Sequence, residues 1–348
     1  MTPVVGKLPD VTAAQRRRIF DAPRTPEAHR ALLAEVDAMN VLQSGGAGTL
    51  AFLPTSFTVA AWNVERCLFP ERSAAHLLSF KPQLVLLSEM DNGMARTGQR
   101  DTTAAMAEAL GMYFVYGVEF HELDLGGETE RRYCEDDFNA HGWHGNAILS
   151  AVPFERVELI RLDDCGHWFC SDKADPKQPR VGGRMAVAAV VPTEAGSICV
   201  VSTHLESNAD AAYRHQQFEQ LLNALDDFAP DMPVLIGGDL NTGNHLPPDY
   251  DWRKETLFAM AQARGYDWGL TPEGITTRAS LISPHENRKM KLDWFAARGL
   301  GGRPNNLLPS LDTDGTPLSD HKCVMADVVV GETISKEKEA AELAGAKE

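Results

Sequence analysis

Six short polar motifs in this sequence each end or follow an apolar, strand-like run. They are Trp62-Asn63, Ser88-Glu89, Ser202-Thr203-His204-Leu205, Gly238-Asp239-Leu240-Asn241, Leu292-Asp293-Trp294 and Ser319-Asp320-His321. Because a sheet gathers the ends of its strands at shared edges, we expect these carboxylate, amide and imidazole groups to meet at one edge. Groups of these types together build sites for a metal ion and a phosphate.

The residue types indicate the chemistry. Hard oxygen ligands come from Asn63, Glu89, Asp239, Asn241 and Asp320. Such ligands suit Mg²⁺ or Mn²⁺ better than zinc. His204 and His321 add groups that exchange a proton near neutral pH. Phosphoester hydrolysis needs this set, because a metal neutralises the phosphate, a carboxylate orients the attacking water and an imidazole handles the developing charge.

Each motif also has a purely structural explanation. Asp239-Leu240-Asn241 is compatible with an ordinary turn after a strand. His204 is compatible with a satisfied core histidine, and Asp320-His321 with an isolated salt bridge. Glu89 follows the apolar run 84–87, where a carboxylate is costly unless it is paired or bound to a metal. The occurrence of all the motifs in one chain favours the functional interpretation.

The elements that position these motifs follow from hydrophobic periodicity. Strand-like runs lie at 57–62, 83–87, 113–118, 146–149, 156–162, 184–191, 198–202, 234–236, 291–296 and 322–330. Helix-like runs lie at 71–80, 102–110, 209–228 and 254–263. The strands outnumber the helices and several lack an intervening helix. This pattern predicts an α/β (α+β) fold with two mainly antiparallel sheets and helices on the outer faces.

Three regions are distinguished along the chain. Residues 1–50 are predicted to be a helical N-terminal extension, in which Thr25-Pro26-Glu27 has the signature of a helix start. Gly45-Gly46-Ala47-Gly48 is interpreted as a hinge before the first strand. Residues 51–331 are predicted to form the main domain, and 332–348 a charged C-terminal tail.

Charge and composition restrict the partners. The chain carries 33 Lys and Arg against 49 Asp and Glu, a formal net charge of -16. Such a field repels bulk polyanions, so nucleic acid is possible as a partner but not favoured, whereas a bound cation still allows a phosphate-ester substrate. We see neither a signal peptide nor an apolar run long enough to cross a membrane. The expectation is a cytoplasmic protein.

Two long polar loops, 121–144 and 163–183, interrupt the pattern, and loops of this length are usually functional or disordered. Cys165 and Cys170, with Cys134 upstream, allow a zinc interpretation, but their spacing and the lack of a clear fourth ligand favour an ordinary loop. His141 and His144 precede a strand and are interpreted as loop residues that line the mouth of the cleft without a catalytic role.

The polar motifs occur in the order and approximate spacing of a known family. Besides the motifs above, the chain has Gly145-Asn146-Ala147-Ile148-Leu149-Ser150 and Lys291-Leu292-Asp293-Trp294. From about residue 57 to 330 it resembles the endonuclease/exonuclease/phosphatase superfamily, the DNase I-like phosphoesterases. The resemblance implies a four-layer α/β/β/α sandwich and a Mg²⁺- or Mn²⁺-dependent phosphoesterase, with residues 51–331 as the catalytic domain.

The resemblance also implies roles for the oxygen ligands. Glu89 would be the principal metal ligand, with Asn63 and Asp320 nearby. Asp239 would orient or deprotonate the attacking water, and Asn241 would hold a phosphate oxygen.

The resemblance assigns roles to the basic side chains as well. Asp293 would hydrogen-bond His321 and fix its tautomer, so that His321 acts as general base or phosphate stabiliser. His204 would bind the phosphate or the transition state. Arg184 is a further candidate for a phosphate contact, although its match to the family is weaker.

Three functions remain open at this point. The first is a phosphodiesterase or phosphatase for a small or lipid-like ester, the second an endo- or exonuclease with the same site, and the third a non-catalytic phosphate-binding module. The complete polar set disfavours the third. The absence of a basic stripe interleaved with aromatic residues disfavours the second. The segment 236–243 lacks the Trp and Arg of the inositol-phosphatase variant of the family, which disfavours that substrate class.

Overall fold

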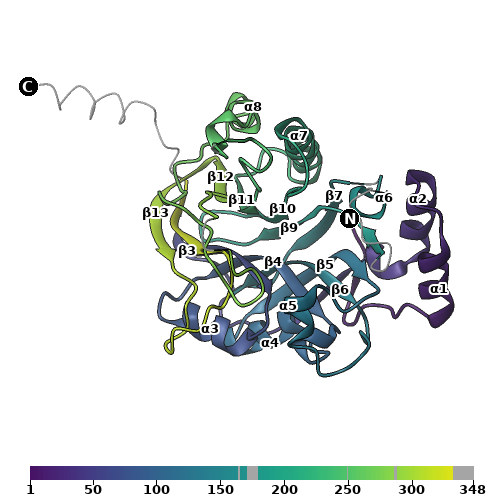
Figure 1. Ribbon diagram of the computed structural model, residues 1–348. Coiled ribbons are helices and arrows are strands. Elements are labelled where there is room, and N and C mark those ends of the chain that lie inside the picture. Colours follow the sequence, from purple (N-terminus) through teal and green to yellow (C-terminus); the bar gives the residue numbers. More distant parts are fainter. Residues whose placement is uncertain (164, 171–178, 249, 286–287, 332–348) are drawn as a thin grey trace, which may run out of the picture.

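The computed structural model describes residues 1–163, 165–170, 179–248, 250–285 and 288–331. Two stacked sheets lie between two layers of helices (Figure 1). This arrangement confirms the predicted α/β/β/α sandwich of two mainly antiparallel sheets. The predicted charged tail, 332–348, lies outside the described residues. In the described part of the chain, no helix combines the length and the hydrophobicity needed to cross a bilayer.

The larger sheet has nine strands among the described residues. In spatial order they are β1 (Val4–Val5), β2 (Leu42–Gly46), β5 (Tyr113–Glu122), β6 (Trp143–Ser150), β4 (Leu84–Asn92), β3 (Ser56–Arg66), β14 (Cys323–Val330) and β13 (Leu300–Leu308), with β8 (Arg180–Gly182) paired to β5. The pairs β1–β2 and β3–β4 are parallel and the others antiparallel.

The smaller sheet delivers much of the polar set. Its strands are, in spatial order, β12 (Asp293–Arg298), β11 (Val234–Asp239), β10 (Ile198–His204), β9 (Met185–Val191) and β7 (Arg156–Arg161). The pair β10–β11 is parallel, and its register places His204 opposite Asp239. On the other side of β11, the antiparallel register places Asp293 opposite Asp239. Backbone pairing alone therefore brings three predicted site residues together.

Helices cover the outer faces of both sheets, and the first two helices lie beside the sheets (Figure 1). They are α1 (Ala13–Asp21), α2 (Pro26–Glu35), α3 (Pro70–Leu78), α4 (Thr102–Leu110), α5 (Glu128–Arg131), α6 (His167–Cys170), α7 (Ala211–Phe228) and α8 (Leu257–Ala263), with short 3-10 turns at Asp37–Asn40, Ala95–Thr97 and Trp252–Lys254. Leu77 of α3 and Met106 of α4 belong to the apolar cluster on the larger sheet, whereas Phe218 of α7 and Leu257 of α8 belong to that on the smaller sheet. A third cluster lies between the two sheets.

The N-terminal segment contains strands as well as helices. Helix α2 begins as predicted, because the Thr25 side chain accepts a hydrogen bond from the Ala28 N–H and Pro26 occupies the first helical position. The predicted hinge, however, is wrong: Gly45 and Gly46 are the last residues of β2, which pairs with β5. A Cβ at Gly45 would lie 2.9 Å from the Phe114 ring, so glycine here permits close packing rather than flexibility.

Candidate active site

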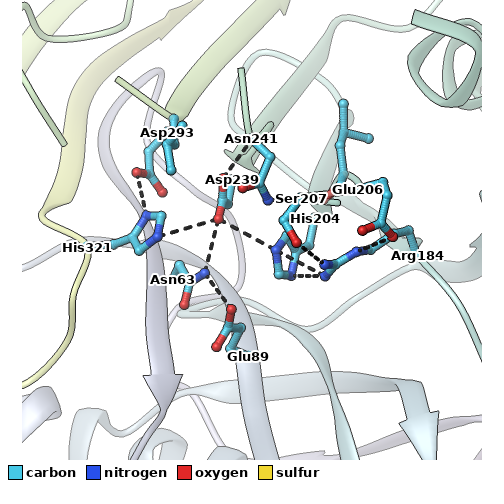
Figure 2. Close-up of polar contacts among 12 residues, drawn as sticks. Asn63, Glu89, Arg184, His204, Glu206, Ser207, Asp239, Asn241, Asp293 and His321 are labelled. Carbon is cyan, nitrogen blue, oxygen red and sulfur yellow. Dashed lines mark hydrogen bonds and ion pairs between the residues drawn. The ribbon is translucent and has the colours of Figure 1, made fainter. Parts of the chain in front are cut away.

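The predicted polar residues converge where strands of the two sheets end side by side (Figure 2). Asn63 and Glu89 lie on β3 and β4 of the larger sheet. His204, Asp239 and Asp293 lie on β10, β11 and β12 of the smaller one. The remaining predicted members follow β11 or precede β14 and β9, namely Asn241, Asp320, His321 and Arg184. The structure thus gathers all nine predicted residues at one edge.

Asp239 occupies the centre of this group. Its Oδ2 lies 3.5 Å from His204 Nε2 and 3.6 Å from His321 Nε2. The same oxygen accepts a hydrogen bond from Asn63 Nδ2 at 3.1 Å, and Oδ1 accepts one from the Asn241 backbone N–H at 2.9 Å. The carboxylate therefore faces two imidazoles at once, an arrangement suited to orienting a reactant or accepting its proton.

His321 is oriented by a buried carboxylate. Its Nδ1 lies 2.8 Å from Asp293 Oδ2, and its backbone N–H donates to Ser319 Oγ at 2.9 Å. Burial alone would lower the pKa of His321, but Asp293, Asp239 and Asp320 together raise the pKa well above its ordinary value. These carboxylates therefore favour the charged form of His321, whose Nε2 faces Asp239.

His204 has different neighbours, because an arginine lies against it. Arg184 Nη1 donates to His204 Nδ1 at 2.9 Å and to Glu119 Oε1 at 2.6 Å, while its Nε donates to Glu206 Oε2 at 3.2 Å. Its Nη2 donates to Ser207 Oγ at 3.1 Å. Only 5% of Arg184 is exposed. The phosphate contact predicted for Arg184 stays a prediction, and the contacts described here suit a residue that positions His204.

The two acids beside Arg184 were not recognised in the sequence. Burial would raise the pKa of Glu119, but Arg184 and His204 lower it to about 2. Burial would likewise raise the pKa of Glu206, and Arg184 with the Asn208 backbone N–H lowers it. Both carboxylates are therefore ionised and fix the guanidinium. The only sequence signals are the position of Glu206 two residues after His204 and that of Glu119 just beyond an apolar run.

Asn63 bridges the two sheets through its amide. Its Oδ1 accepts a hydrogen bond from the Glu65 N–H at 3.0 Å, so its Nδ2 faces Glu89 Oε1 at 3.0 Å and Asp239. The other Glu89 oxygen forms an ion pair with Arg66. Burial would raise the pKa of Glu89, but Arg66, then His204 and His144, lower the pKa well below its ordinary value. Asn63 thus orients two carboxylates rather than presenting its carbonyl oxygen to the site.

The backbone is strained at this edge. Glu65, Arg66 and Cys67 have φ values of 44°, 74° and 56°, and Glu89 has 61°. The pairing registers shift at the same places, between Asn63 and Arg66 on β3 and between Leu87 and Met90 on β4. Left-handed conformations of such residues cost roughly 1–3 kcal/mol each and concentrate at functional sites. The two shifts in pairing register change the direction of the side chains that flank Glu89.

Negative charge accumulates around Asp320. Burial, and then the charge of Asp320, raise the pKa of Glu65 to about 8, although Glu65 Oε1 accepts a hydrogen bond from Ser280 Oγ at 2.6 Å. Burial and Glu89 raise the pKa of Asp320 in the same way. The Arg288 guanidinium lies 3.6 Å from Asp320 Oδ2. The charges of Glu65, Glu89 and Asp320 thus affect one another, and carboxylate oxygens are ligands that a divalent cation prefers.

A second group of potential metal ligands consists of Asp239, Asp293 and His321, whose ligand atoms lie within 4.8 Å of one another. In this group Asp293 Oδ2 and His321 Nδ1 already bond to each other at 2.8 Å. The corner with Glu89 and Asp320 fits a metal better, because the side chains of these two residues keep 17% and 11% exposure. They form the part of the site that solvent reaches.

The other motifs lie apart from this group. His144 Nδ1 contacts Asp91 Oδ1 at 2.9 Å on buried β6, and His141 Nδ1 contacts Asp10 Oδ1 at 2.9 Å. Cys165 Sγ lies 3.1 Å from Asp163 Oδ1, and Cys170 Sγ contacts the Cys165 carbonyl. Within the described residues, no cluster of metal-ligating atoms includes a cysteine. The structure therefore gives the zinc interpretation no support.

Comparisons with known proteins agree with this geometry. Residues 60–321 match the model of the endonuclease/exonuclease/phosphatase family. No curated protein matches the sequence. One similar solved structure is an endonuclease/exonuclease/phosphatase from Beutenbergia cavernae DSM 12333, with 20% identity, a TM-score of 0.54 and coverage of 79% of this chain and 72% of that one.

Two further solved structures share the fold. The human Nocturnin catalytic domain with bound sulfate anion has 17% identity and a TM-score of 0.54, with coverage of 82% of this chain and 97% of that one. D. rerio TDP2 complexed with a single-strand DNA product has 16% identity and a TM-score of 0.53, with coverage of 78% and 98%. At these identities the likeness concerns the architecture.

Proposed function

Since the chain belongs to the endonuclease/exonuclease/phosphatase family, which comprises hydrolases of phosphoester bonds, we propose that it is a divalent-metal-dependent phosphoesterase that cleaves a phosphodiester or phosphomonoester with water. We assign this activity to residues 51–331. The observation that carries the proposal is the position of Asp239, whose Oδ2 lies 3.5 Å from one imidazole and 3.6 Å from another. A purely structural aspartate would not need two histidines and an asparagine around it.

Glu89 and Asp320 would hold Mg²⁺ or Mn²⁺, with Asn63 keeping Glu89 in place through its amide. When bound, the cation supplies Lewis-acid stabilisation of the charge on the phosphate oxygens. The raised pKa of Asp320, to which burial and the neighbouring charge of Glu89 contribute, supports this assignment. The open choice between Mg²⁺ and Mn²⁺ follows from the oxygen donors, which suit both.

The remaining residues handle the water and the phosphate. Asp239 orients the attacking water and accepts its proton. His321, held charged by Asp293, donates a hydrogen bond to the phosphate as negative charge develops. Asn241 uses one Nδ2 proton for the Leu205 carbonyl at 3.1 Å, which leaves the second proton for a phosphate oxygen.

His204 and Arg184 complete the opposite side of the phosphate position. The donor-only guanidinium of Arg184 lies 2.9 Å from His204 Nδ1, and Glu119 Oε2 lies 3.5 Å from the same nitrogen. Together they fix the ring so that Nε2 faces Asp239. We propose that His204 binds the phosphate or its transition state and that Arg184 positions His204.

Metal-dependent hydrolysis of bis-p-nitrophenyl phosphate and nicking of a plasmid, measured in parallel, test the proposal. Asp239→Ala provides the control. Diester cleavage without nicking, lost in the variant, supports a small or lipid-like phosphodiester as substrate. Nicking lost in the variant identifies a nuclease, the alternative that the net charge of -16 disfavours. Silence on both substrates and on p-nitrophenyl phosphate, with Mg²⁺ and with Mn²⁺, would contradict catalysis and favour a phosphate-binding module.

A further inference from the structure

A row of alternating charges connects Glu89 with the loop between β5 and β6. Asp91 Oδ2 accepts from Arg96 Nε at 2.7 Å, and Arg96 Nη1 donates to Glu130 Oε1 at 2.8 Å. Glu130 Oε1 also accepts from Arg66 Nε at 2.8 Å, and Arg66 Nη1 forms an ion pair with Glu89. One guanidinium, that of Arg66, is therefore shared between the proposed metal ligand and the loop.

Burial increases along this row away from Glu89. The side chains of Asp91 and Arg96 are fully buried, that of Glu130 keeps 9% exposure and those of Arg66 and Glu89 keep 17% each. Charges shielded from water in this way interact much more strongly than surface pairs. Removing one charged side chain of this row therefore changes the electrostatic interactions of the next one.

The loop fixes the position of Glu130 independently of Arg66. Glu130 lies on α5, and its Oε2 accepts the Gly127 N–H at 2.6 Å in a capping arrangement. Arg96 remains paired with Asp91 and with Glu122 at 3.0 Å even without Glu130. Glu130 is thus a fixed point that attracts Arg66 from the side opposite Glu89.

The backbone gives a second, separate indication. Arg66 is the middle one of three successive left-handed residues, and Glu89 opposite is also left-handed, with φ values of 74° and 61°. Both lie where the β3–β4 pairing shifts register. Strain on both strands at the place where the two side chains meet indicates that their juxtaposition is part of the function.

We propose that Arg66 is a positioning residue that competes with the divalent cation for Glu89, and that Glu130 limits this competition by holding part of the guanidinium charge. This inference rests on the proposed function, because it takes Glu89 as a metal ligand. A cation at Glu89 is repelled by the nearby guanidinium and attracted by Glu130. The β5–β6 loop therefore sets the metal affinity of the site through Arg66.

Titration calorimetry of the full chain with MnCl₂ tests the proposal without reference to activity. Arg66→Met removes the competing charge while keeping an unbranched apolar side chain, and we expect Mn²⁺ to bind at least about tenfold more tightly. Arg131→Met is the matched control, because Arg131 follows Glu130 on α5 and pairs with Asp124 at 2.7 Å. It changes the net charge equally, and we expect a change in affinity below about twofold.

The Glu130→Gln variant is expected to change the Mn²⁺ affinity in the opposite direction. It leaves Arg66 to Glu89 alone, so Mn²⁺ should bind several-fold more weakly. In the Arg66→Met background the same change should have a clearly smaller effect, which a double-mutant cycle measures. If circular dichroism shows that Arg66→Met does not fold, the loss of affinity in Glu130→Gln decides alone, because unchanged Mn²⁺ binding in that variant overturns the inference.

The Glu89→Gln variant tests the metal assignment of Glu89 separately from the competition by Arg66. Loss of Mn²⁺ affinity in this variant, together with tighter binding by Arg66→Met, supports both the metal site and the competition. Loss in Glu89→Gln with Arg66→Met equal to the Arg131→Met control overturns the competition alone. Unchanged affinity in Glu89→Gln overturns the metal assignment and, with it, this inference.

Discussion

Two buried histidines lie in opposite electrostatic surroundings. His321 faces three carboxylates at the edge of the sheets, and they raise its pKa well above the ordinary value. His121 lies on β5 beside Trp143, with ring centroids 4.6 Å apart. Burial, followed by the charge of Arg16, lowers the pKa of His121 to about 3. Burial beside a cation thus favours the neutral imidazole of His121, whereas facing carboxylates favour the charged imidazole of His321.

The comparison explains which buried histidine belongs to the site. Both rings are at least 98% covered, so exposure does not distinguish them. The distinguishing feature is the pair of acids around His321, at 2.8 Å from Nδ1 and 3.6 Å from Nε2. An imidazolium so placed can stabilise charge on a phosphate, whereas the His121 ring serves packing.

The largest effect is expected for Asp239→Asn, which removes the charge that faces the imidazoles of both His204 and His321. We expect kcat on the diester substrate to fall by about 10³-fold, since proton transfer and orientation both depend on this carboxylate. Steady-state kinetics, with circular dichroism as the check on folding, measure the loss. A decrease below about 100-fold would contradict the role given to Asp239.

The variants His321→Gln and His121→Gln test the difference between the two histidines directly. The first should lower kcat by about 10²- to 10³-fold, because it removes the charged donor. The second should leave kcat within about threefold, because the His121 ring packs against Trp143, which is not one of the predicted site residues. Equal losses in the two variants would show that burial, rather than the carboxylate partners, decides the contribution of a histidine.

The Asp293→Asn variant tests the charge state of His321 through the pH dependence of activity. In the native protein Asp293 raises the pKa of His321, so its removal lowers that pKa. If His321 acts as an imidazolium, activity declines as pH rises through its pKa, and this basic limb moves to lower pH in the variant with a loss of about tenfold in kcat/KM at neutral pH. If His321 acts instead as a neutral base, an acid limb moves to lower pH. The pH profiles of both proteins distinguish the two roles.

The smallest effect concerns stability in acid. The pKa of His121 is lowered from the unfolded value of 6.5 to about 3, so between these pH values the unfolded chain binds a proton that the native protein excludes. Stability from this residue is present above pH 6.5 and is lost as pH falls toward 3. His121→Phe should abolish this part, which is about 1 kcal/mol at about pH 5.5. Urea unfolding at pH 7.5 and 5.5 measures it, and parallel losses in both proteins would contradict the prediction.

Much of this site was predictable because its residues end strands in short motifs. Asp239 ends the apolar run of β11 and Asp293 begins that of β12, and the antiparallel register of these strands places the two residues opposite each other. Glu119 was missed because nothing within a strand marks one acid as facing a site. Arg66 was missed because a register shift, which depends on tertiary pairing, re-aims its side chain. Arg184 was found, but only the folded structure shows it beneath His204.

The fold was predictable in its centre and less so at its edges. Central strands such as β4 and β10 are buried on both faces and appear as apolar runs. Strands at or next to an edge, such as β13 and β2, need no such run. β13 includes Gly301, Gly302 and Pro304, and β2 ends in two glycines, yet both pair through their backbones. The amino-acid sequence therefore does not reveal these two strands, because backbone hydrogen bonds form without any particular pattern of side chains.

The parallel register of β10 and β11 determines where this chain tolerates changes in length. A single inserted residue within either strand would turn every following side chain to the other face and separate His204 from Asp239. The crossover through α7 that joins the two strands is outside this constraint. Its surface end, between Phe228 and Val234, is therefore the place to insert an epitope or a fluorophore without disturbing the pairing of these two residues.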